Sequence, residues 1–170
     1  MSRAGYYEDD DDPLALGRWR AQVMSATRGR RGQQFLRDLL ASLDAMPEKR
    51  LITDELEVSL EADVKRAEAW AEITGLPTKD YHKFYKRPET YKDGDVCALG
   101  ALGRSRGLPV AEINPTNHEQ ISTAFDIAEP LAREVVYIND ECGYGETPEA
   151  RWVRVRAWVS NQIKKPALAE

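Results

Sequence analysis

The sequence has few of the residues from which reactive centres and disulfide frameworks are built. It contains two cysteines and two histidines in 170 residues, and none of the four has the spacing of a metal site. We expect Cys97 and Cys142 to be reduced, buried thiols. No Ser-His-Asp or Cys-His-Asn pattern stands out either. These absences argue against an enzyme, and we expect no metal and no cofactor.

Long apolar segments are also missing. No run of about 18 apolar residues occurs, which predicts that nothing spans a membrane. The N-terminal residues are acidic and lack an apolar core, so we expect no signal peptide and a cytoplasmic protein.

Charge is abundant and unevenly distributed. The net charge is −5, of which residues 1–12 contribute −4. Residues 15–37 contain six arginines and no acid, and residues 79–92 sum to +3, whereas residues 111–149 sum to −8. The molecule is therefore predicted to be a charge dipole, and its overall acidity is a poor guide to its partners.

Apolar spacing predicts an all-α fold of about six helices in one compact domain, residues 13–165. The helix expected at 13–27 and the strongly amphipathic one at 35–46 are separated by a short turn, which predicts an antiparallel helical hairpin. Asp12 and Pro13 suggest the start of the first helix, and Asp54 the start of another. Residues 1–12 are expected to form a disordered acidic tail and residues 166–170 a C-terminal tail. Later helices are expected at 96–108, 117–125, 129–139 and 147–163.

Three stretches together resemble a family of small uncharacterised proteins from bacteriophages, prophages and mobile elements. They read RWRAQVMSATRGRRGQQFLRDLLASLDAMPEKRLI, GDVCALGALGRSRGL and ETPEARWVRVRAWVSNQI. The resemblance implies a phage-type accessory protein in a bacterial host and supplies no catalytic residues. It also implies that residues 58–92, an inserted helix followed by a basic-aromatic loop, interrupt the family pattern.

Two segments are predicted to meet a partner. Arg28, Arg30 and Arg31 stand in a glycine-containing turn before a helix, where free amides and guanidinium groups suit an anion such as phosphate. The alternative, which the sequence favours, is an exposed turn without a ligand. The second segment interleaves aromatic and basic side chains, which could stack on bases, form a protein hot spot or fold back onto the core. Its candidate contacts are Tyr81, Lys83, Phe84, Tyr85, Lys86 and Arg87.

Three other patterns are weaker. Residues 119–136 have the apolar spacing of a helix-turn-helix, but the second helix is too acidic to face phosphates, so simple helix packing is favoured. GALGRSRG lacks the Lys-Ser/Thr ending of a phosphate loop, and we interpret its glycines as sites of close helix packing. Asp140, Glu141 and Glu146 could hold a cation or a proton, but a solvated acidic loop is the simpler interpretation.

The leading hypothesis is a non-catalytic phage-type protein that binds a host or phage macromolecule, most simply a protein. Counter-defence or host takeover would be the role that the family resemblance implies. The alternative is a nucleic-acid-binding protein that uses the turn at residues 28–31 and the loop at residues 81–92. The oligomeric state does not follow from the sequence.

Overall fold

The computed structural model describes residues 14–143 and 145–164, and the all-α prediction is confirmed for them. The predicted acidic tail of residues 1–12, the predicted helix start at Asp12 and Pro13, and the C-terminal tail of residues 166–170 lie outside these ranges. In the described part, no helix has the length and apolar character needed to cross a membrane.

Eight α-helices form in the described part of the chain, more than the predicted six, together with two 3-10 turns. The shortest α-helix and the first 3-10 turn fall where the sequence predicted an extended loop. The elements are α1 (Ala15–Arg28), α2 (Arg30–Ala45), α3 (Leu60–Thr74), η1 (Thr78–Asp80), α4 (Tyr81–Phe84), α5 (Ala98–Ser105), η2 (Val110–Glu112), α6 (His118–Phe125), α7 (Glu129–Asp140) and α8 (Pro148–Gln162).

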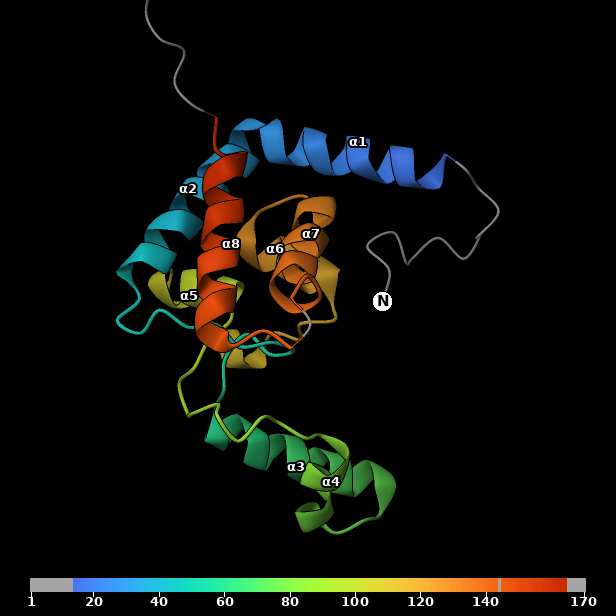
Figure 1. Ribbon diagram of the computed structural model, residues 1–170. Helices are drawn as coiled ribbons and strands as arrows, with labels where there is room; N and C mark the ends of the chain where they lie inside the picture. The colour runs from blue at the N-terminus through green and yellow to red at the C-terminus, as the bar shows by residue number, and fades with distance from the viewer. Residues whose placement is uncertain (1–13, 144, 165–170) are drawn as a thin grey trace, which may run out of the picture.

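The helices form a body and a projecting arm (Figure 1). The body contains α1, α2 and α5 to α8. The amphipathic stripe of α2 lies at its centre, where Leu36, Leu39 and Leu43 are fully buried against α5 and α8. The arm, defined here as residues 59–93, contains α3 and α4 and extends away from the body.

The predicted antiparallel hairpin of the first two helices is wrong. Only Gly29, which has extended backbone angles, separates α1 from α2, and the two helices diverge there while α1 lies across α7 (Figure 1). Gly32 makes this corner tight, because a Cβ at that residue would lie 2.0 Å from the Ala26 carbonyl oxygen. Gln33 fixes it further by donating to the carbonyls of Thr27 and Gln162.

The arm joins the body through a neck of two antiparallel segments, residues 51–58 and 94–97. Ile52 N donates to Val96 O at 3.1 Å, and Val58 and Gly94 continue the ladder. These backbone bonds explain why the helix predicted to start at Asp54 begins instead at Leu60. The neck also stands where the sequence predicts the insertion of residues 58–92 to begin and end; the insertion itself stays a prediction.

The helices predicted at residues 117–125, 129–139 and 147–163 are confirmed. The Thr147 side chain accepts from Ala150 N ahead of Pro148, and the Asn117 side chain accepts from Gln120 N. The chain breaks between α6 and α7 at Asp126, which has left-handed backbone angles. Fixed local hydrogen-bonding geometry makes such caps visible in a sequence.

The glycines of α5 permit close packing, as predicted. A Cβ at Gly100 would lie 1.8 Å from the Leu56 carbonyl oxygen, so this helix rests directly on the backbone of the neck. Gly17 in α1 has no atom within 4 Å of the equivalent position.

We expect Gly100→Ala to destabilise the protein by about 2–3 kcal/mol, because the added methyl group forces the neck backbone away from α5. Gly17→Ala is the matched control and should stabilise the fold by up to about 1 kcal/mol, since alanine favours a helix and meets no neighbour. Urea denaturation measures both. A Gly100→Ala protein as stable as the wild type would contradict this packing.

Candidate functional site

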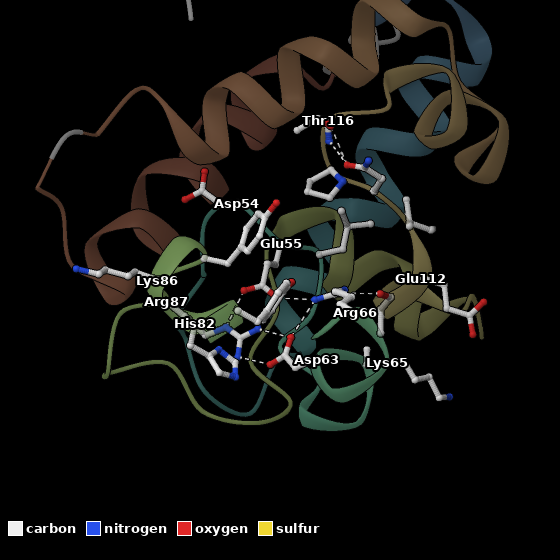
Figure 2. Close-up of a pocket in the computed structure, with 18 residues that line it drawn as sticks. Asp54, Glu55, Asp63, Lys65, Arg66, His82, Lys86, Arg87, Glu112 and Thr116 are labelled. Atoms are coloured by element: carbon white, nitrogen blue, oxygen red, sulfur yellow. Dashed lines mark hydrogen bonds and ion pairs between the residues drawn. The ribbon is translucent and has the colours of Figure 1, made fainter. Parts of the chain in front are cut away.

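A hollow of about 700 Å³ lies where the arm meets the body. One wall comes from α3 and the segment after α4, and the other from the neck and residues 111–116. Figure 2 shows that charged side chains gather at its base. We therefore built the candidate site from these charges and from the aromatic residues beside them.

Two arginines and two carboxylates form a closed network, which we call the clasp: Glu55, Asp63, Arg66 and Arg87. Arg87 donates to both oxygens of Glu55 at 2.7 Å and to Asp63 at 2.7 and 3.0 Å. Arg66 donates to Asp63 at 3.1 Å and to Glu55 at 3.3 Å. Arg66 also reaches the Ala111 carbonyl at 2.7 Å and so ties α3 to the body.

The clasp is largely shielded from solvent and electrically neutral. The side chain of Asp63 is 8 % exposed and that of Arg87 is 21 % exposed. Hydrogen bonds to Glu55 and then to Asp63 raise the pKa of Arg87 above its ordinary value. Two positive and two negative charges cancel, so the base of the hollow offers no excess charge to an ion. The clasp therefore positions the arm, because bidentate guanidinium pairs fix geometry.

An aromatic cluster covers the arm beside the clasp. Trp70 lies edge-on to Tyr81 at 6.0 Å between ring centroids and contacts Phe84 at 5.5 Å. Tyr81 stacks on Tyr85 at 4.7 Å. Phe84 and Tyr85 are nevertheless 64 % and 56 % exposed. The rings are thus held in place by each other while presenting apolar surface outward.

The predicted partner-binding residues of the arm have different surroundings. Lys83 pairs with Asp80 at 2.5 Å, while Lys86 points away from the clasp (Figure 2) and forms no ion pair with a described residue. Arg87 differs from the sequence-based expectation: its guanidinium faces inward and is fully used by Glu55 and Asp63. It acts as a positioning residue for the arm.

The predicted residues of the other segment lie far from the arm. Arg28, Arg30 and Arg31 are exposed at the corner between α1 and α2, at the end of the molecule opposite the arm (Figure 1). Arg31 pairs with Asp126 at 3.0 Å. The structure therefore separates the two predicted contact segments.

Sequence reasoning missed Glu55, Asp63, Arg66 and Trp70. Their partners are distant in sequence, so no local motif announces them. One signal was present: Asp63 is an acid on the otherwise apolar face of α3 that also contains Ala67. A charge on such a face needs a partner.

Of the remaining candidate groups, which are the cysteines and His118, Cys97 has a structural role. Cys97 caps α5 by accepting from Gly100 N at 3.4 Å, and burial raises the pKa of its thiol to about 12, which makes it unreactive at neutral pH. Cys142 was expected to be buried but is exposed, because it lies in the turn after α7. His118 lies in the first turn of α6.

The acids at and after the end of α7 do not form one site. Glu146 accepts from Arg154 at 2.8 Å and is used in that pair. Asp140 accepts from Asn139 Nδ2 at 2.6 Å, but burial, with the nearby Asp54 carboxylate adding to it, raises the pKa of Asp140 to about 6. No group of three histidine, cysteine, aspartate or glutamate side chains within residues 14–143 and 145–164 could hold a metal ion.

Comparison of the chain with protein-family models, with curated proteins and with solved structures finds no match. Function must therefore be inferred from the geometry of the chain itself.

The raised pKa of Asp140 makes stability depend on pH. Because it lies above the ordinary value of 3.8, the native state holds the proton more tightly than the unfolded chain. The contribution of the protonated Asp140 side chain to the free energy of unfolding is fully present below pH 3.8 and is lost as the pH rises through about 6. Asp140→Asn keeps an acceptor oxygen and removes the charge. A pKa raised from 3.8 to about 6 corresponds to about 3 kcal/mol, so the substitution should be more stabilising by about this amount near pH 8 than at low pH.

Urea denaturation at both pH values measures this difference. Glu68→Gln removes an exposed carboxylate from α3 and is the control, for which we expect the same small effect at both pH values. An Asp140→Asn effect that does not grow with pH would contradict the account of this carboxyl group.

Proposed function

We propose that this protein is a non-catalytic binding protein that docks on another protein through its arm. The observation that carries the proposal is the distribution of exposed apolar side chains. Of the ten large hydrophobic side chains exposed in the described part, six belong to the arm. Exposed apolar groups gathered in this way are typical of interaction sites. The six are Leu60, Val64, Ile73, Leu76, Phe84 and Tyr85.

The construction of the arm supports the same proposal. The neck, the clasp and the Arg66 bond to the Ala111 carbonyl hold it against the body, so docking requires little ordering of the chain. Its exposed rings are already fixed by contacts with Trp70 and with each other. Rigid aromatic side chains are the residues that most often dominate protein interfaces.

The identity of the partner follows from the family resemblance alone. A phage-type accessory protein meets proteins of the bacterial host or of the phage itself, and the role we propose is counter-defence or host takeover. The clasp is neutral and its guanidinium and carboxylate groups pair with each other, so we assign the arm a role in binding and no reaction.

The nucleic-acid alternative is less well supported for the arm. Lys83 and Arg87 are held in internal ion pairs, which leaves fewer cations for phosphates than the sequence suggested. Acidic side chains on α3, including Glu61, Glu68 and Glu72, also bring the arm close to neutral. Apolar contact therefore outweighs charge on this surface.

We expect Ile73→Ser and Phe84→Ala each to weaken partner binding at least about tenfold, since each removes apolar contact from the arm. Ile73 is 86 % exposed, so its replacement leaves the fold of the arm intact even if Phe84→Ala loosens the aromatic cluster. The measurement is quantitative capture from nuclease-treated lysate of a bacterial host, with wild-type and variant proteins compared side by side.

Val153→Ser is the matched control, because Val153 is a 60 % exposed apolar residue on α8 of the body. It should capture the partner as well as the wild type does. A partner that both arm variants retain at the wild-type level, or no specific partner at all, would contradict docking through the arm.

A further inference from the structure

The corner between α1 and α2 exposes a concentration of positive charge. Residues 15–37 contain six arginines and neither aspartate nor glutamate. All six are exposed, and their positions cover both helices and the Gly29 junction. They are Arg18, Arg20, Arg28, Arg30, Arg31 and Arg37.

Most of this charge is not neutralised by the residues that the structure describes. Arg31 pairs with Asp126, but Arg20, Arg28, Arg30 and Arg37 form no ion pair with any residue in 14–143 or 145–164. The arginines of the rest of the body behave differently. Each of the following has a carboxylate within 3.0 Å: Arg104 with Glu57, Arg106 with Asp38, Arg154 with Glu146 and Arg156 with Asp44.

The free guanidinium groups also have a regular placement. Arg30, Gln34 and Arg37 occupy positions i, i+4 and i+7 of α2, opposite the buried stripe of Leu36, Leu39 and Leu43. Seven residues of α-helix advance by about 10.5 Å, so Arg30 and Arg37 form a row along the solvent face. Arg28 extends this row across the corner.

We propose that this corner binds the phosphate backbone of a nucleic-acid duplex. Guanidinium groups match phosphate geometry, and a row of them can follow a strand that carries a charge at regular intervals. A single strand fits less well, because stacking needs exposed aromatic rings. The two aromatic residues of the described part of this segment, Trp19 and Phe35, are 5 % and 2 % exposed.

This surface is independent of the proposed docking arm. The two stand at opposite ends of the molecule (Figure 1), so one protein could hold a duplex and a protein partner together. The corner binds without reading sequence, since phosphate contacts position a protein on nucleic acid and do not identify bases.

Binding to a mixed-sequence DNA duplex about two turns long tests the proposal, with the full chain and its acidic residues 8–12 in place. Fluorescence anisotropy is followed between about 50 and 200 mM salt. The triple variant Arg28→Gln/Arg30→Gln/Arg37→Gln should bind at least about tenfold more weakly at the lowest salt. Its salt dependence should also fall by about three units of slope, one for each lost phosphate contact.

The matched control is Lys79→Gln/Lys86→Gln/Lys92→Gln, which removes the same charge from the arm, and it should bind the duplex as the wild type does. Equal losses for both triple variants would show a general charge effect and overturn the proposal. So would a wild-type protein that does not bind the duplex, or one that binds a single strand or polyglutamate more tightly. The arginine variant should still capture the protein partner, which separates this test from that of the arm.

Discussion

The clasp is the interaction on which the use of the arm depends. Arg66 and Arg87 each bridge Glu55 of the neck and Asp63 of α3, so a segment of about one fifth of the chain is fixed relative to the body. Apart from these four charges, the arm is joined to the body by the backbone ladder of the neck and by hydrogen bonds at Thr90 and Tyr91. Partly buried charges of this kind contribute through geometry more than through net stability, because desolvation offsets much of their attraction.

The body holds the neck firmly, because helices of the body contact the neck backbone directly. Gly100 lets α5 rest on the Leu56 carbonyl, and the buried Asn139 joins three segments by donating to Ile52 O and accepting from Ala98 N. Arg151 adds a bond to Leu51 O. The neck is therefore held by α5, α7 and α8 of the body. This explains how the arm, which contributes few residues to the core, keeps a defined direction.

The sequence predicted what depends on neighbouring residues and missed what depends on distant ones. Helix caps such as Thr147 were predictable from local residue types, and the buried stripe of α2 and the all-α class from periodicity. The direction of α2 after Gly29 was not predictable, because one extended residue redirects the chain. The charge pattern was only half informative: Arg87 is used internally, whereas Arg28 and Arg30 keep their charge at the surface. Ion pairs across tens of residues cannot be read from composition.

The most direct test is the distance between the arm and the body in solution. Spin labels at Ile73→Cys and Val153→Cys, in a chain with Cys142→Ser, occupy two exposed positions, while Cys97 is buried and unreactive. Pulsed electron resonance should give one narrow distance distribution, and adding Arg87→Gln should broaden it. A broad distribution in the chain that keeps Arg87, or one that Arg87→Gln leaves unchanged, would contradict a rigid arm held by the clasp.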